Sequence, residues 1–200
     1  MKSWATNQKG FTIAELVIVV SVIAILATIT VVAFRGTTDR AEQTRTVAQV
    51  QTVYEAVKNF YSEHGQWPLA GWVCVGNISD FPAQDDFPAG ACAIRTSDGG
   101  ATWSVWYAAN TTLMNDLGPY LGPSFKPLLP VLKPDAPLVS GTWYYKWRGV
   151  VYDDYNTSGR NATVFYGIKG STCPMKLASA SYYAWTGGRE CGYDISGAQN

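Results

Sequence analysis

A single apolar run near the N-terminus, residues 11–34, limits what this chain can fold into, because its only ionisable side chain is Glu15. As an α-helix the run is long enough to span the hydrocarbon core of a bilayer, which is about 30 Å thick. Lys2 and Lys9 precede it, whereas the arginines beyond it are offset by acidic residues. This bias predicts a cytoplasmic N-terminus and an outward-facing remainder. No small-residue cleavage site closes the far end of the run, so we expect the segment to be retained.

Glu15 needs an explanation, because a carboxylate in a membrane costs about 2.5–3.5 kcal/mol at a helix centre and less near its end. No basic side chain within residues 11–34 can pair with it. If the chain were cut after Gly10, the free amine of Phe11 would be cationic at neutral pH and one helical turn away. Glu15 could then pair with the amine of its own chain or of a neighbouring copy, and the second pairing would set the register between subunits. The plainer alternative places Glu15 among the lipid head groups.

The stretch "KGFTIAELVIVV" resembles the leader and mature start of the type IV pilins and of the related pseudopilins of type II secretion and competence systems. The resemblance implies that a prepilin peptidase cuts between Gly10 and Phe11 on the cytoplasmic side and that the new Phe11 amine is methylated. It also implies that Glu15 meets the Phe11 amine of the neighbouring subunit during assembly. Many relatives carry a proline late in the span, where this chain has Val32, so we predict no proline kink.

Residues 35–65 continue the helical periodicity and carry an apolar stripe at spacings of 3 and 4 residues: Val47, Val50, Tyr54, Val57 and Tyr61. Such a stripe predicts a helix packed on the chain's own sheet. Gly65 and then Pro68 indicate its end. The stretch "NFYSEHGQWPLAG" resembles the place where the long helix of the pilin family ends. We expect His64 to be a polar residue of the last turn rather than a catalytic base.

Four cysteines form two pairs, each 18 residues apart, and no C-x-x-C motif occurs. This pattern predicts two disulfides outside the cytoplasm rather than a metal site. Of the three possible connectivities we favour the local ones, Cys74 with Cys92 and Cys173 with Cys191, because each closes a loop without strong periodic structure. Free buried thiols are the alternative. By resemblance to many pilins, the second loop would be part of the exposed filament surface.

Residues 66–200 are expected to form one small antiparallel sheet domain. Residues 67–101 are predicted to be an irregular disulfide-closed loop, 102–109 a short strand and 111–122 a brief helix. Prolines from Pro119 to Pro137 are expected to exclude regular structure. Residues 142–156 alternate with a period of two and predict one long strand, with 162–170 as its return strand in a hairpin. The region around Cys173 and Cys191 is expected to be a loop with an edge strand.

Charge and motifs exclude several functions. The 15 basic and 15 acidic residues cancel, so a nucleic-acid partner is not expected. The sequence has one histidine and neither a G-x-S-x-G motif nor a Gly-rich phosphate loop, so we expect no enzyme activity and no cofactor. The pairs Asp85–Asp86 and Asp153–Asp154 could serve as glycosidase carboxylates or bind Ca²⁺. Such pairs are more typical of solvated turns, so we expect no metal site.

Aromatic residues are abundant, with eight Trp and twelve Tyr. Most are expected to fill a small core, while any that remain exposed would suit sugar faces or protein grooves. Adhesion is therefore a hypothesis that the composition permits.

These observations predict an α+β protein in which a long N-terminal α-helix packs on a small antiparallel sheet domain with disulfide-closed loops. Its expected divisions are a leader (1–10), a transmembrane or filament-core helix (11–34), an amphipathic continuation (35–65) and a globular domain (66–200). We expect a structural subunit of a type IV pilus that is held in the cytoplasmic membrane with its N-terminus inside and then assembled into an extracellular filament.

The resemblance implies as partners other copies of the chain, a prepilin peptidase, an assembly ATPase and membrane platform proteins. The filament would support adhesion, twitching motility or DNA uptake. One alternative is a pseudopilin of a secretion or competence system. A second is a monomeric membrane-anchored adhesin or lectin, which predicts no cleavage at Gly10 and tolerance of Glu15→Ala.

Overall fold

The computed structural model describes residues 11–129, 143–154, 162–169, 172–173, 179–180, 184–185 and 188–195. It divides into two compact units, Met1–Ala41 and Glu42–Asn200. The elements follow in the order α1 (Ile13–His64), β1 (Val73–Cys74), a 3₁₀ turn (Ile78–Asp80), β2 (Ala91–Thr96), β3 (Ser104–Ala109), α2 (Thr111–Leu121), β4 (Tyr144–Trp147), β5 (Val150–Asp153), β6 (Thr163–Lys169), β7 (Ser179–Ala180), β8 (Ala184–Trp185) and β9 (Gly188–Asp194).

Helix α1 is continuous from Ile13 to His64, as the periodicity predicts. It ends where Gly65 adopts a φ of +68° and donates its N–H to the Tyr61 carbonyl at 2.8 Å, a helix end that favours glycine. Its C-terminal part buries the predicted stripe and further residues beside it, so the buried face is wider than predicted: Val50, Val53, Tyr54, Ala56, Val57 and Phe60 are buried, and Val47 and Tyr61 are partly buried.

The strands form one sheet in the order β4-β2-β3-β1-β5-β6-β9-β7, with β8 paired to β9. All pairs are antiparallel except β1 and β3, which run parallel with Val73 opposite Ala108. The α+β class is confirmed, but the sheet is mixed rather than purely antiparallel. The parallel pair arises because the two-residue β1 lies between β3 and β5, which run in opposite directions.

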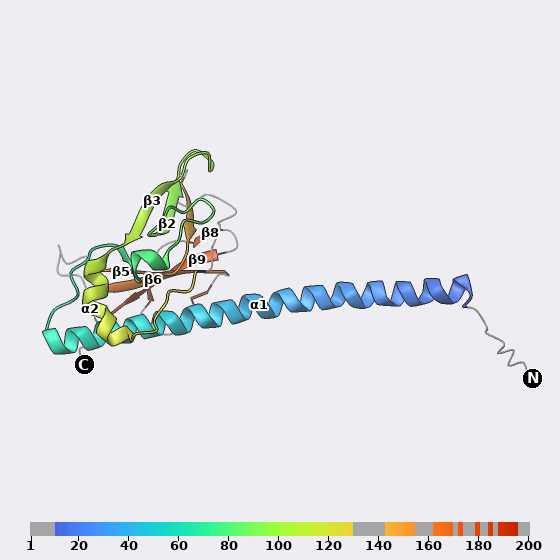
Figure 1. The fold of residues 1–200 in the computed structure, drawn as a ribbon, viewed down its shortest axis with the longest axis horizontal. Coiled ribbons are helices and arrows are strands. Elements are labelled where there is room, and N and C mark those ends of the chain that lie inside the picture. The colour runs from blue at the N-terminus through green and yellow to red at the C-terminus, as the bar shows by residue number, and fades with distance from the viewer. Residues whose placement is uncertain are drawn as a thin grey trace, which may run out of the picture. The chain divides into compact units, whose positions relative to one another are not determined.

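The two faces of the sheet are covered differently. On one face, Val150, Tyr152 and Val164 pack in a cluster with residues of α1 and α2. Figure 1 shows α2, β5 and β6 beside the C-terminal part of α1. On the other face, Val151 and Phe165 pack in a second cluster with the disulfide cysteines Cys74 and Cys92 and several aromatic residues. Consecutive residues of β5 and β6 therefore contribute to opposite clusters, as the pleat requires.

Helix α2 confirms the brief helix predicted for residues 111–122. Asn110 caps its start by accepting a hydrogen bond from the Leu113 N–H at 3.0 Å. Leu113, Leu117 and Leu121 lie one turn apart on the buried face. The expectation that Pro119 excludes regular structure is wrong, because Pro119 lies in the last turn of α2, whose leucines anchor the helix to the core. Residues 130–142, which hold the later prolines, lie outside the described residues.

The prediction of an irregular loop for residues 67–101 is wrong in part, because β1 and β2 lie within it. Strand β2 is paired on both sides, with β3 and with β4, and it is buried on both faces except at Arg95. It therefore lacks the period-two pattern by which a half-buried strand is recognised.

The single long strand predicted for residues 142–156 is also wrong. The chain bends at Arg148 and Gly149, where Gly149 has a φ of +80°, and so forms β4 and β5. Strand β4 pairs with β2, whereas β5 pairs with β1 and β6, so one stretch of chain joins two parts of the sheet. The pairing of the predicted hairpin is confirmed for its second half, where β5 runs antiparallel to β6 with Val150 opposite Tyr166.

Candidate functional site

Residues Ile13–Thr30 of the apolar run lie on α1 with exposed side chains. Residues Ile13–Thr30 form a helix long and apolar enough to cross a membrane by length and composition, and none of that stretch is buried within the described structure. Large hydrophobic side chains with exposures from 49% to 86% follow one another along it: Phe11, Ile13, Leu16, Val17, Ile18, Val19, Val20, Val22, Ile23, Ile25, Leu26 and Ile29. An apolar surface of this size needs lipid or protein to cover it.

The start of α1 is a reciprocal cap between Thr12 and Glu15. The Glu15 carboxylate Oε2 accepts hydrogen bonds from the Thr12 backbone N–H and from the Thr12 hydroxyl, both at 2.8 Å. The Glu15 backbone N–H in turn donates to the Thr12 hydroxyl oxygen at 3.3 Å. This is the geometry of a capping box, in which a threonine and a glutamate three residues later satisfy free N–H groups at the helix start.

The cap fixes the position of the one carboxylate in the apolar segment. It lies at the helix end, where the backbone dipole favours negative charge. The T-x-x-E spacing that signals this cap is present in "FTIAEL", so Thr12 is a hydrogen-bonded partner of Glu15 in addition to the charged partner expected. Pairing of Glu15 with the Phe11 amine remains a prediction, and Gly10 lies outside the described residues.

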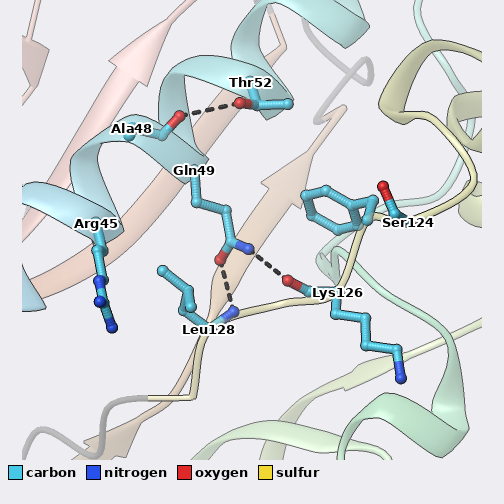
Figure 2. A pocket seen from close by; sticks show the side chains of 8 residues that line it. Arg45, Ala48, Gln49, Thr52, Ser124, Lys126 and Leu128 are labelled. Carbon is cyan, nitrogen blue, oxygen red and sulfur yellow. Dashed lines mark hydrogen bonds between the residues drawn. The ribbon is translucent and has the colours of Figure 1, made fainter.

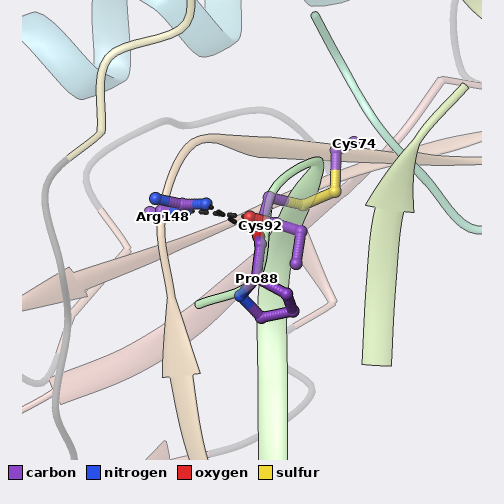
Figure 3. Close-up of a disulfide and its surroundings, with 5 residues drawn as sticks. Cys74, Pro88, Cys92 and Arg148 are labelled. Atoms are coloured by element: carbon purple, nitrogen blue, oxygen red, sulfur yellow. Dashed lines mark hydrogen bonds between the residues drawn. A yellow bond between two sulfur atoms is a disulfide. The ribbon is translucent and has the colours of Figure 1, made fainter. Parts of the chain in front are cut away.

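Both disulfides have the local pairings that the sequence favours, Cys74 with Cys92 and Cys173 with Cys191. Arg148 lies beside the first of them (Figure 3), and its backbone N–H donates to the Cys92 carbonyl at 2.8 Å. Its guanidinium Nε donates to the Ala91 carbonyl at 2.8 Å. Burial lowers the pKa of Arg148, and the negative charge of Asp85 opposes that change. This buried cation therefore joins β4 to the start of β2.

The acidic pairs considered for Ca²⁺ have other roles here. Asp86 forms an ion pair with Lys146 on β4. Asp154 accepts hydrogen bonds from the backbone N–H groups of Ala70 and Gly71 at 2.7 and 2.9 Å. Within the described part of the chain, no group of three or more His, Cys, Asp or Glu residues is placed to hold a metal ion. One carboxylate of each pair, Asp86 or Asp154, thus anchors a loop.

His64 is a structural residue of the last turn of α1. Its ring stacks on that of Phe60 at 4.2 Å between centroids, and its Nδ1 lies 3.0 Å from the Phe60 carbonyl. Nearby, the Tyr120 hydroxyl donates to Glu63 at 2.6 Å, which ties the end of α1 to α2. The arrangement agrees with the expected role as a polar helix end.

A groove of about 450 Å³ lies between α1 and the segment that follows α2, and Arg45, Lys126 and the apolar part of Leu128 are among its lining residues. Figure 2 shows Gln49 at its centre. The Gln49 side-chain Nε2 donates to the Lys126 carbonyl at 2.7 Å, and its Oε1 accepts from the Leu128 N–H at 2.8 Å. Both ends of the amide are therefore occupied by backbone, and the groove is a packing feature of the helix and this segment.

Comparison with known proteins bears on the N-terminal segment. Residues 5–31 match the family model described as the prokaryotic N-terminal methylation motif. The chain is 38% identical over 63 residues to a fimbrial protein of Neisseria meningitidis serogroup B, and the match covers 32% of this chain and 37% of that protein. Type IV major pilin protein PilE1 of Neisseria gonorrhoeae is 38% identical over 63 residues, with 32% of this chain and 38% of the relative covered.

A third relative, fimbrial protein EcpC of Eikenella corrodens, is 38% identical over 61 residues, which are 30% of this chain and 40% of that protein. The match thus spans no more than about two fifths of these curated relatives. No solved structure gives a significant match. The chain is therefore similar to type IV pilins and fimbrial proteins over about a third of its length, and its residues 5–31 carry the methylation motif.

Proposed function

We propose that this chain is a structural subunit of a type IV pilus filament, matured by cleavage between Gly10 and Phe11 and by methylation of the Phe11 amine. The observation that carries the proposal is the exposed apolar segment Ile13–Thr30 with a single capped carboxylate at its start. Before assembly a membrane would cover this segment. After assembly the same segments of neighbouring copies would cover it.

Burial of the segment would drive filament formation. A fully buried Val, Leu, Ile or Phe side chain contributes about 1.5–3 kcal/mol relative to exposure, and twelve such side chains are exposed between Phe11 and Ile29. Apolar burial has no preferred axial register, so a polar contact must provide one. Glu15 would supply it by meeting the Phe11 amine of a neighbouring copy, because an unpaired charge in an apolar bundle is strongly penalised.

The remaining parts of the proposal concern location and partners. The precursor would lie in the cytoplasmic membrane with its N-terminus inside. Its leader would be residues 1–10, its membrane or filament-core helix 11–34, its amphipathic helix 35–65 and its outer domain 66–200. A prepilin peptidase, an assembly ATPase and platform proteins would serve assembly, and the chain itself would have a structural rather than a catalytic role. Adhesion, twitching motility and DNA uptake are the functions such a filament would support.

The first test is intact mass and N-terminal sequencing of protein sheared from cells. A chain that begins at Phe11, with or without one added methyl group, would support processing and release in fibres. Glu15→Ala should abolish the sheared material, whereas Glu42→Ala, which removes an exposed carboxylate farther along α1, should not.

Two other outcomes would redirect the proposal. A chain that still begins at Met1 and stays in the membrane fraction would overturn it in favour of a membrane-anchored adhesin or lectin. Loss of secretion or DNA uptake upon deletion, without visible fibres in the wild type, would instead indicate a pseudopilin.

A further inference from the structure

Three side chains from three neighbouring segments meet on the sheet face that is remote from α1. Arg95 is on β2, Trp106 is on β3, and Trp143 immediately precedes β4. Strand β2 lies between β4 and β3, with Arg95 opposite both Tyr145 and Ser104. Trp106 is two residues after Ser104, and Trp143 is two residues before Tyr145. Both tryptophans are therefore diagonal neighbours of Arg95 on the same face of the sheet.

The Arg95 guanidinium lies over both indole rings, with its central carbon 4.8 Å from the Trp143 centroid and 5.7 Å from the Trp106 centroid. Both distances are within the range of cation–π attraction. Trp143 is 37% exposed, and Arg95 and Trp106 are partly exposed. The rings therefore hold the guanidinium at the surface without burying it.

The side chain of Arg95 forms neither a hydrogen bond nor an ion pair with any residue in the part of the chain that the structure describes. Two other cations of this part of the chain have partners: Lys146 on β4 pairs with Asp86, and Arg148, which follows β4, donates to backbone carbonyls. A guanidinium carries five N–H donors in a planar fork, and no described residue accepts a hydrogen bond from those of Arg95.

We propose that Arg95, Trp106 and Trp143 form a binding site for an acidic saccharide, with the sugar carboxylate on the Arg95 guanidinium and the apolar face of a sugar ring on an indole. The planar fork of arginine matches a carboxylate in bidentate geometry. Indole faces provide flat apolar area beside it, which suits the C–H face of a pyranose ring. All three residues belong to one chain, so no second copy is needed to complete the site.

A single-stranded nucleic acid, which also combines rings with anions, fits less well. Such ligands are held by a positively charged groove that follows several phosphates, and their binding is largely electrostatic. Here Arg95 is the cation that lies over the two indole rings in the described part of this face, and the chain has no net charge. The observations therefore favour a ligand with one carboxylate per ring.

The test is isothermal titration of the full chain in detergent micelles with trigalacturonate, its neutral counterpart galactotriose and a thymidine tetranucleotide. Trigalacturonate should bind the wild type at least about tenfold more tightly than galactotriose. Arg95→Gln should weaken trigalacturonate binding about tenfold or more, since it removes a charge-assisted contact. Trp143→Leu should also weaken it. The matched control is Arg45→Gln, which removes an exposed arginine on α1 and should leave binding unchanged.

Circular dichroism would verify that each variant folds. If Arg95→Gln failed to fold, Arg95→Lys would keep the charge, remove the planar fork and still be expected to weaken binding several-fold. The proposal would be overturned if the wild type did not bind trigalacturonate or bound galactotriose equally tightly. It would also be overturned if the Arg95 variant bound trigalacturonate as tightly as the wild type. Tighter binding of the tetranucleotide would overturn it in favour of a nucleic-acid surface.

Discussion

Gln49 on helix α1 and Leu128, which is 79 residues later, are joined by a hydrogen bond of 2.8 Å from the Leu128 backbone N–H to the Gln49 side-chain Oε1. The other end of the amide donates to the Lys126 carbonyl at 2.7 Å. One side chain therefore satisfies a donor and an acceptor of the same extended segment, much as a neighbouring strand would.

Gln49→Glu should destabilise the outer domain by about 1–3 kcal/mol, because it removes the donor to Lys126 and places a carboxylate against a carbonyl. Gln51→Glu changes an exposed residue two positions along the same helix and should change stability by no more than about 0.5 kcal/mol. Urea unfolding followed by tryptophan fluorescence would measure both. Equal midpoints for the two variants would show that the clamp contributes nothing.

Gly149→Ala should destabilise the protein by about 1–3 kcal/mol. Gly149 has a φ of +80°, and a Cβ at this position would lie 3.1 Å from Cε1 of the buried Phe81. Gly118→Ala is the matched control, since Gly118 lies in α2 with open space around it, and there the same substitution should stabilise by about 0.5–1 kcal/mol. Thermal unfolding would thus show shifts of opposite sign, and two shifts of the same sign would contradict the prediction.

Glu190 on β9 should make stability decrease as the pH rises. It is 2% exposed, and its Oε2 has no hydrogen-bond partner among the residues that the structure describes. Burial raises the pKa of Glu190 from an ordinary value of 4.5 to about 8. Between those two values the folded state keeps a proton that the unfolded state has released, so the free energy of unfolding falls across this window and the penalty is absent below it.

Glu190→Gln should remove this dependence and stabilise the protein by about 1–3 kcal/mol near pH 8, with little effect near pH 4.5. The difference between variant and wild type, measured by urea unfolding at a series of pH values, isolates Glu190 from the other titrating groups. Glu42→Gln, at an exposed position on α1, serves as the control. A difference that stays constant with pH would mean that Glu190 is already ionised in the fold.

The two disulfides should differ in their resistance to reduction. Both span 18 residues, so the loss of chain entropy is the same, about 3 kcal/mol of stabilisation each. Cys74 and Cys92 are both fully buried, whereas Cys173 is only partly buried. Under graded dithiothreitol in native buffer, the pair Cys173–Cys191 should therefore open first. Thiol alkylation with mass spectrometry would identify it, and earlier labelling of Cys74 or Cys92 would contradict the prediction.

Thr12 should matter for assembly through its hydroxyl group. Thr12→Val keeps the shape of the side chain but removes the two hydrogen bonds that the hydroxyl forms with Glu15, and it should reduce the yield of sheared fibres several-fold. Thr12→Ser keeps the hydroxyl and should retain the yield. Immunoblotting of sheared and membrane fractions would measure both. An equal yield from both variants would show that the cap does not position Glu15 for assembly.

Local patterns in the sequence determined several features of this protein. Five of them each depend on residues close together in the chain: the length of α1, its end at Gly65, the local cysteine pairs, helix α2 and the hairpin of β5 and β6. The resemblance to the pilin family likewise rests on residues close together in the chain: the order Lys9-Gly10-Phe11, Glu15 and the apolar run. A helix long enough to span a membrane is encoded by composition alone.

Only the tertiary structure decided the order of the strands and the two faces of the sheet. Strand β2 is buried on both faces and β1 is two residues long, so neither has a period that could be recognised. The period of two continues across Arg148 and Gly149, although the backbone bends there and sends β4 and β5 to different neighbours. The meeting of Arg95 with Trp106 and Trp143 depends on that strand order, because residues distant in sequence become neighbours only through long-range pairing.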